Sequence, residues 1–233
     1  MFDFVRKYLD LAVKLLMVAV LVAAPVSMYM IIGFAPLEAV MGAPQKIFYY
    51  HVPIAILSYL GLFICFAGSA AYLYTGREEY DAVALSGAEV GTLFITLVMI
   101  TGMLWARPSW GAYWTWDPRL TTSLVLWLIY SGYLLLRTQV EDTTLRAKYA
   151  AVMGIVGFVD VPIVHYSVQL WTRGIHPVVD KSGPDHGMDP RMLQTLMACF
   201  PTIALIFALL FAIRLRYEFA HRRLERLKAQ SKG

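Results

Sequence analysis

The hydrophobic and polar residues of this chain form six long apolar stretches separated by short polar segments. A helix crosses a hydrocarbon core about 30 Å thick with about 20 residues. Backbone amides in lipid must be paired within their own segment, so we expect helices. Strands of a membrane barrel would alternate over about ten residues, and these stretches do not alternate. The expected helices cover about residues 12–32, 53–75, 83–104, 120–136, 149–170 and 193–213.

The composition agrees with an all-α integral membrane protein, a six-helix transmembrane bundle. Hydrophobic residues make up 59% of the chain and charged residues 15%, whereas soluble domains carry about 25% charged residues. No linker, repeat or change of composition divides the chain, so we expect one transmembrane domain over residues 1–233. The first apolar stretch continues to about Ile32 and is too long for the core of a secretory signal, so we expect it to be retained.

The positions of lysine and arginine predict the orientation of the bundle. With both termini in the cytoplasm, 14 of the 20 basic residues lie inside, as the positive-inside rule favours. We expect the basic tail, residues 214–233, to lie beside anionic lipid rather than to bind nucleic acid. The outer, periplasmic segments are then about 33–52, 105–119 and 171–192. Functional loops are expected on this outer face of the inner membrane.

Four of the six tryptophans lie within twelve residues, in the run TGMLWARPSWGAYWTWDPRLTT. They are Trp105, Trp110, Trp114 and Trp116. Tryptophan also collects in aromatic belts at membrane interfaces, but a belt has two rims. The inner helix ends use tyrosine and no tryptophan, so the asymmetry favours a binding site on one side of the membrane.

Histidine suggests what such a site binds. His51 precedes the second helix, and His176 lies in the last outer segment with His186 nearby. Two histidines from different segments, on either side of the tryptophan run, allow a metal between them, and imidazole is a good ligand for haem iron. We expect His165 to be a packed histidine bonded within the bundle rather than a ligand.

Several chemistries are excluded by absent patterns. The two cysteines lie within expected helices and form no C-x-x-C or C-x-x-C-H motif, so covalent haem attachment is not predicted. Walker A, H-E-x-x-H and G-x-S-x-G are absent as well. We therefore expect no enzymatic activity.

The segment WGAYWTWDPRLT resembles the tryptophan-rich signature of haem-handling membrane proteins of cytochrome c biogenesis. The continuation RLTTSLVLWLIY, the preceding YYHVP and the following VPIVHYSV are similar to one branch, cytochrome c maturation protein C or haem exporter protein C. The resemblance covers roughly residues 45–180, with a matching length and helix count. Tyr113 and Pro118 depart from the pattern of that branch.

The resemblance implies that the chain holds haem b, without a covalent bond, at the periplasmic face and delivers it to a haem chaperone. The implied partners are that chaperone, a small membrane subunit and ABC transporter subunits of the same system. The axial iron ligands carry over onto His51 and His176. The stretch between His165 and His176 is about one residue longer than in the family, so His186 remains an alternative. The signature carries over onto Trp110, Gly111, Trp114, Trp116, Asp117 and Arg119.

The residue chemistry points the same way. Haem is a flat apolar disc with two propionates, and an indole stacked on it is worth about 0.5–1.5 kcal/mol beyond burial. Trp105 and Tyr113 extend the aromatic surface. Arg107 and Arg119 suit either the propionates or lipid headgroups. Asp117 suits either orienting Arg119 or capping the fourth helix.

Two other functions use the same residues. A b-type cytochrome for electron transfer would ligate haem with these histidines, but it usually places them inside the bundle. A permease for haem or another small molecule would use Asp160, which lies deep in an apolar stretch. For Asp160 we favour a structural hydrogen bond, to His165 or a neighbouring helix, over a place in a transport path.

Overall fold

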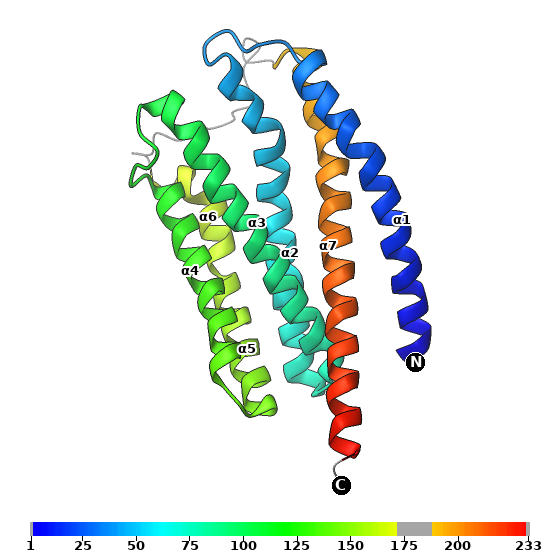
Figure 1. Ribbon diagram of the computed structural model, residues 1–233. Coiled ribbons are helices and arrows are strands. Elements are labelled where there is room, and N and C mark those ends of the chain that lie inside the picture. The colour runs from blue at the N-terminus through cyan, green and yellow to red at the C-terminus, as the bar shows by residue number, and fades with distance from the viewer. Residues whose placement is uncertain (1, 172–187, 232–233) are drawn as a thin grey trace.

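The computed structural model describes residues 2–171 and 188–231, and its named secondary-structure elements are all helices (Figure 1). The helices are α1 (Phe2–Tyr29), α2 (Phe48–Thr75), α3 (Glu78–Trp110), α4 (Pro118–Gln139), α5 (Thr143–Phe158), α6 (Asp160–Leu170) and α7 (Pro190–Gln230). A π-helical turn (η1, Met30–Phe34) follows α1, and a 3-10 turn (η2, Ala43–Ile47) leads into α2. Among these residues the one β-type pairing is an isolated bridge between Glu38 and Gly42. Six segments are long and apolar enough to cross a membrane, which confirms the expected all-α six-helix fold.

The two ends of the bundle differ in what they contain. Figure 1 places the α3–α4 connection, residues 111–117, at one end and both chain termini at the other. We call these the tryptophan end and the terminal end. Six membrane-length segments, an even number, agree with both chain termini lying at the same end of the bundle.

The helices are mostly longer than expected, and three departures bear on the site and on the ends of the bundle. The fifth stretch is two helices that meet at Val159, because Pro162 has no N–H to bond the carbonyl of Phe158. The third helix continues to Trp110 rather than ending near residue 104. The last helix continues to Gln230 rather than ending near residue 213, so most of the basic tail is helical. Arginine and glutamate four residues apart support this extension through ion pairs along the helix.

Glycines bring α2 and α3 into close contact at the centre of the fold. A methyl group added at Gly61 would lie 2.7 Å from the Cα of Gly91. One added at Gly87 would lie 2.8 Å from the carbonyl oxygen of Gly61. Only hydrogen in place of a side chain allows the two backbones to approach so closely. The main core lies around this pair, with Leu62, Leu126, Tyr130 and Tyr133 almost completely buried.

The first helix lies at the side of the bundle, next to α7 (Figure 1). Only 11% of its most apolar window is buried within the protein, so most of its surface is left for lipid. Three polar contacts hold it to its neighbours, one of them an ion pair between Asp10 and Arg216 of α7 at 2.8 Å. Ser27 and Tyr50 of α2 share a hydrogen bond of 2.8 Å, and the Thr202 hydroxyl of α7 donates to the carbonyl of Ala23 at 3.4 Å.

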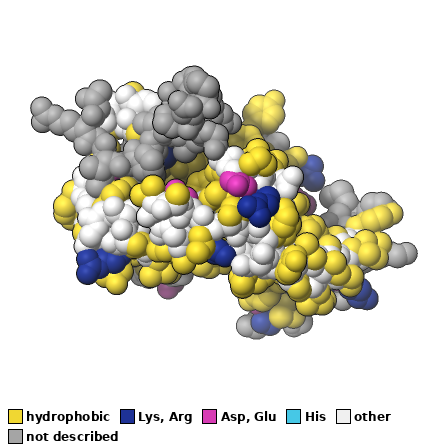
Figure 2. All heavy atoms as spheres, turned by 90° about the horizontal axis from the view of Figure 1, so that it is seen from above, with side chains coloured by type: hydrophobic (Ala, Val, Ile, Leu, Met, Phe, Trp, Pro, Cys, Tyr) yellow, Lys and Arg dark blue, Asp and Glu magenta, His cyan; other side chains and the backbone are white. Residues whose placement is uncertain are grey.

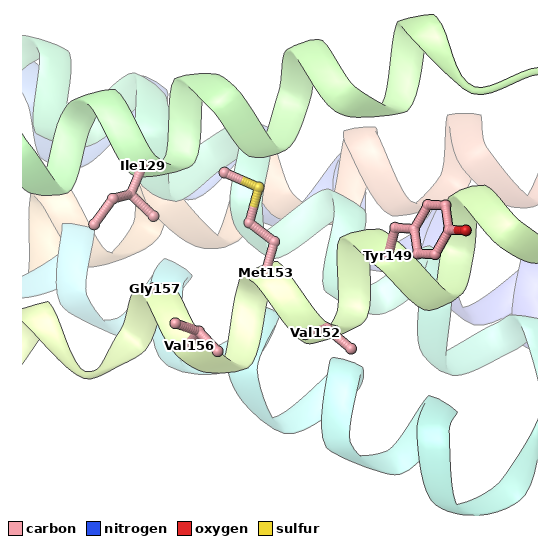
Figure 3. Close-up of a pocket in the computed structure, with 6 residues that line it drawn as sticks. All are labelled: Ile129, Tyr149, Val152, Met153, Val156 and Gly157. Atoms are coloured by element: carbon pink, nitrogen blue, oxygen red, sulfur yellow. The ribbon is translucent and has the colours of Figure 1, made fainter.

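A shallow groove of about 460 Å³ lies between α4 and α5. Figure 3 shows Ile129 of α4 facing the side chains of α5 across it. Its lining is apolar apart from one tyrosine hydroxyl and consists of Ile129, Tyr149, Val152, Met153, Val156 and Gly157. Such a lining suits contact with hydrocarbon, and it contains no histidine and no charged side chain.

Candidate functional site

The tryptophan run forms the end of α3 and the connection to α4. Trp105 and Trp110 are helical residues of α3. Gly111 ends the helix with a φ of 77°, a conformation that glycine adopts without strain. The expected loop of residues 105–119 is therefore shorter than predicted and covers residues 111–117, which contain Trp114 and Trp116.

The four indoles form two perpendicular pairs rather than one flat surface. Trp105 and Trp110 meet edge to face, with ring centroids 5.5 Å apart and planes at 87°. Trp114 and Trp116 do the same at 5.6 Å and 85°. Trp116 is 77% exposed, whereas the other three are half-buried. Seen from this end in Figure 2, hydrophobic side chains cover much of the visible surface, with few charged groups between them. Trp116 is therefore the most exposed of the four indoles.

The charged residues of the run make contacts with the protein. Asp117 is buried and caps α4 by accepting a hydrogen bond from the backbone N–H of Arg119 at 2.9 Å. Asp117 therefore caps the fourth helix, which is one of the two roles considered for it in the sequence. Arg119 donates to the carbonyl of His165 in α6 at 3.1 Å. Arg107 donates to the carbonyl of Gly111 and lies 5.7 Å from the ring centre of Tyr113. These contacts shape the connection, and contact with propionates stays a prediction.

His51 lies on α2, which begins at Phe48, rather than before the helix. Its Nδ1 lies 2.8 Å from the hydroxyl oxygen of Thr101 in α3. A methyl group added at Gly102 would lie 3.3 Å from the Cε1 of His51, so this glycine leaves room for the ring. Trp105 follows Thr101 by four residues and so lies on the same face of α3. The fold therefore brings His51 together with the end of α3.

The contact with Thr101 fixes the proton on the imidazole of His51. The Thr101 hydroxyl already donates its hydrogen to the carbonyl of Leu97 at 2.6 Å. It must therefore accept from His51, which requires the proton on Nδ1. The lone pair then lies on Nε2, the nitrogen that is available to a metal. Histidine ligands are commonly oriented in this way by a hydrogen bond to their other nitrogen.

Replacing Thr101 with valine tests this arrangement. Thr101→Val keeps the side-chain shape but removes the acceptor for Nδ1, so we expect an iron ligated by His51 to be held about 10–100-fold more weakly. Haem titration of the purified variant measures the change. Thr122→Val is the control, because that hydroxyl bonds only within α4. Equal affinity in the wild type and Thr101→Val would contradict the assigned role.

One expectation about the fifth membrane segment is wrong. The ring of His165 is exposed and meets Tyr166 edge to face at 4.8 Å, so it is not packed within the bundle. The buried Oδ2 of Asp160 has no hydrogen-bond partner in the described residues, and a structural hydrogen bond of Asp160 stays a prediction. Asp160 begins α6 directly after Val159, the residue that caps α5.

The second predicted iron ligand is not placed. His176 and its alternative His186 both lie outside the described residues. The described chain resumes at residue 188, just before α7 begins at Pro190. Ligation by either histidine stays a prediction.

Sequence reasoning missed the contacts that position the site. Thr101 and Gly102 lie fifty residues from His51, and no local pattern pairs them. Trp127, in the middle of α4, packs against the core and donates a hydrogen bond to Thr96 at 2.9 Å. Its indole therefore belongs to the bundle and not to the tryptophan end.

Comparison with known proteins gives a consistent result. The family model for heme exporter protein C (CcmC) matches residues 3–230. Heme exporter protein C of Bradyrhizobium diazoefficiens is 34% identical over 196 residues, which cover 84% of this chain and 74% of that protein. The protein of the same name from Escherichia coli strain K12 is 32% identical over 185 residues, covering 79% and 74%. A ccmC-like mitochondrial protein of Arabidopsis thaliana, whose name refers to cytochrome c biosynthesis, is 30% identical over 190 residues, covering 82% and 72%.

The matched region includes every described helix almost in full, together with the tryptophan run and His51. On the extent of that match, this multi-pass membrane protein belongs to the heme exporter protein C family.

Proposed function

We propose that this chain binds haem at its tryptophan end and passes it to a haem chaperone during cytochrome c maturation. His51 ligates the iron through Nε2 on one face of the porphyrin, and His176 ligates it on the other. The cargo is haem b, held without a covalent bond. The tryptophan end faces the periplasm from the inner membrane, and the chain works beside ABC transporter subunits and a small membrane subunit of the same system.

The observation that carries this proposal is the setting of His51. Its Nδ1 bonds Thr101 at 2.8 Å, which leaves Nε2 as the ligating nitrogen. The ring contacts Thr101, which precedes Trp105 by one helical turn in α3, at the end of the bundle that also contains Trp114 and Trp116. An imidazole with a fixed proton beside large aromatic surfaces matches the needs of a flat apolar ligand with a metal centre.

The exposure of the site favours delivery over permanent storage. Trp116 is 77% exposed, and residues 111–117 are a connection at the rim rather than part of the core. A ligand held there is open to a second protein from one side. Exchange of an axial ligand for a histidine of the acceptor would move the iron without a catalytic residue in this chain.

A transfer experiment tests the proposal. Haem-loaded protein in nanodiscs is mixed with a soluble apo-globin, and the globin spectrum reports the haem it receives. We expect transfer from the wild type. In Trp114→Ala/Trp116→Ala we expect haem affinity to fall about tenfold, since two indole contacts of about 0.5–1.5 kcal/mol each are lost.

Trp127→Ala is the matched control, because that indole bonds Thr96 inside the bundle. It should destabilise the fold without changing the haem affinity of the folded fraction. Equal losses in both variants would show that the tryptophans serve packing alone. Haem that remains on the wild-type chain in excess globin would point instead to a b-type cytochrome.

A further inference from the structure

Six charged side chains form a connected and largely buried network at the terminal end. Three are arginines and three are acids, so their formal charges cancel. They come from α3, α4 and α7, which are far apart in sequence. The members are Asp81, Glu89, Arg137, Arg214, Glu218 and Arg222.

Asp81 is the centre of this network. Its two carboxylate oxygens accept from both terminal nitrogens of Arg137 at 2.7 and 2.8 Å. Its Oδ2 also accepts from Arg222 at 2.7 Å. Asp81 is 4% exposed, so the two arginines replace the water that its charge would otherwise require. One residue of α3 thus holds α4 and α7 at the same time.

The network continues along α7. Arg222 donates to Glu218 at 2.8 Å and to the backbone carbonyl of Glu78 at 3.0 Å. Arg214 bridges Glu218, at 2.9 Å, and Glu89 of α3. Two turns of α7 are therefore joined to α3 by charge-assisted bonds, and breaking a buried pair leaves an uncompensated charge.

Asp81 holds α4 and α7 near the terminal end of the bundle. The opposite end of each of these helices, where the helix begins, lies toward the candidate site. α4 begins immediately after the tryptophan connection, with Arg119 in its first turn. The start of α7 packs against Tyr49, two residues before His51, through Met192 and Cys199. About 27 Å of α4 separates Arg119 from Arg137 at 1.5 Å per residue.

The middle of α7 also contacts α3. Phe207 meets Phe94 of α3 edge to face at 5.3 Å. Arg222 lies about 22 Å from Phe207 along the helix, and Pro190 lies about 26 Å away on the other side. Because α7 continues through Pro201 as one helix, holding its terminal end constrains where its start lies.

We propose that Asp81 is a positioning residue for the haem site. By pairing with Arg137 and Arg222 together, it fixes where the far ends of α4 and α7 lie relative to α3 and His51. This inference rests on the proposed function for its effect on haem, while the geometric effect on α7 stands separately.

Pulsed electron-electron spin resonance on the full chain in nanodiscs tests the geometric effect. Spin labels are attached at Leu104→Cys in α3 and Leu193→Cys in α7, which are 52% and 49% exposed. The native Cys65 and Cys199 are fully buried and should not take up label. We expect Asp81→Asn to shift or broaden the distance distribution at this end. In the unlabelled variant we expect haem affinity to fall about threefold, with a changed ligand-field spectrum.

Glu78→Gln is the matched control. Glu78 pairs with Arg226 on the same two helices, but both side chains are at least half exposed, and its backbone carbonyl is retained. It should leave the label distances and the haem spectrum unchanged. Asp81→Glu, which keeps the charge, should restore most of the wild-type distribution.

The outcomes separate this inference from the proposed function. Unchanged distances and an unchanged haem spectrum in folded Asp81→Asn would overturn the positioning role, even if the yield of protein falls. Shifted distances in a chain that binds no haem would uphold the positioning of α7 and reject the haem site. If Asp81→Asn does not fold, Arg222→Gln replaces it, because that variant keeps the Asp81–Arg137 pair. It should shift the label distances by a smaller amount. Unchanged label distances in Arg222→Gln would also overturn the positioning role.

Discussion

His51→Ala should retain about tenfold less haem than the wild type, or less still, when both are purified from the same haem-supplied cells. Loss of an outer hydrogen bond to a ligand already lowers metal affinity by about 10–100-fold, and this change removes the ligand itself. The bound fraction should lose the spectrum of an iron with two imidazole ligands. Absorption spectra and haem content per chain measure both effects.

Imidazole added to His51→Gly sharpens the test. The missing ring leaves a space beside Thr101 and Gly102, where free imidazole fits and restores the ligand. We expect the wild-type spectrum to return as imidazole is titrated. His165→Ala is the control, because that ring is exposed and its backbone carbonyl still accepts from Arg119. An unchanged spectrum in His51→Ala would remove His51 from the site.

The largest effect on stability is expected from a single methyl group at Gly61. Gly61→Ala places that group 2.7 Å from the Cα and 2.8 Å from the amide nitrogen of Gly91. Both are backbone atoms, so α2 and α3 must separate. Overpacking of this kind costs about 1–3 kcal/mol. Thermal unfolding in detergent should show a clearly lower midpoint than the wild type.

The same substitution at Gly132 should have no such effect. There the added methyl group meets only the terminal carbon of Met153, at 3.0 Å, and a flexible side chain moves easily. Alanine also favours a helix over glycine by about 1 kcal/mol. Equal destabilisation by Gly61→Ala and Gly132→Ala would mean that the α2–α3 contact is not the tight one described.

The length of the apolar stretches was sufficient to predict the fold class. Six stretches of about 20 apolar residues leave little alternative to six crossing helices, and the structure has them. The ends of the helices were harder to predict, because charges mark the limit of lipid rather than the limit of a helix. α7 passes Arg214 without interruption since its glutamates and arginines pair along one face. The break at Val159 follows from Pro162, which a hydropathy pattern does not register.

The candidate site could be predicted in its residues but not in its geometry. The tryptophan run and His51 stand out in the sequence by type and spacing. Their partners do not, because Thr101 and Gly102 face His51 only once α2 and α3 are packed in register. The perpendicular indole pairs also depend on where α3 ends. The Asp81 network could not be read from the chain, since its members meet only in three dimensions.

The unbroken length of α7 has a further consequence for the surroundings of the protein. Its 41 residues extend about 61 Å at 1.5 Å per residue, roughly twice the thickness of the hydrocarbon core. About half of the helix must therefore lie beyond the hydrocarbon core, among headgroups and in water. A soluble protein that approaches the terminal end meets the last turns of α7. In these turns Leu224 and Leu227 are each at least half exposed among charged side chains.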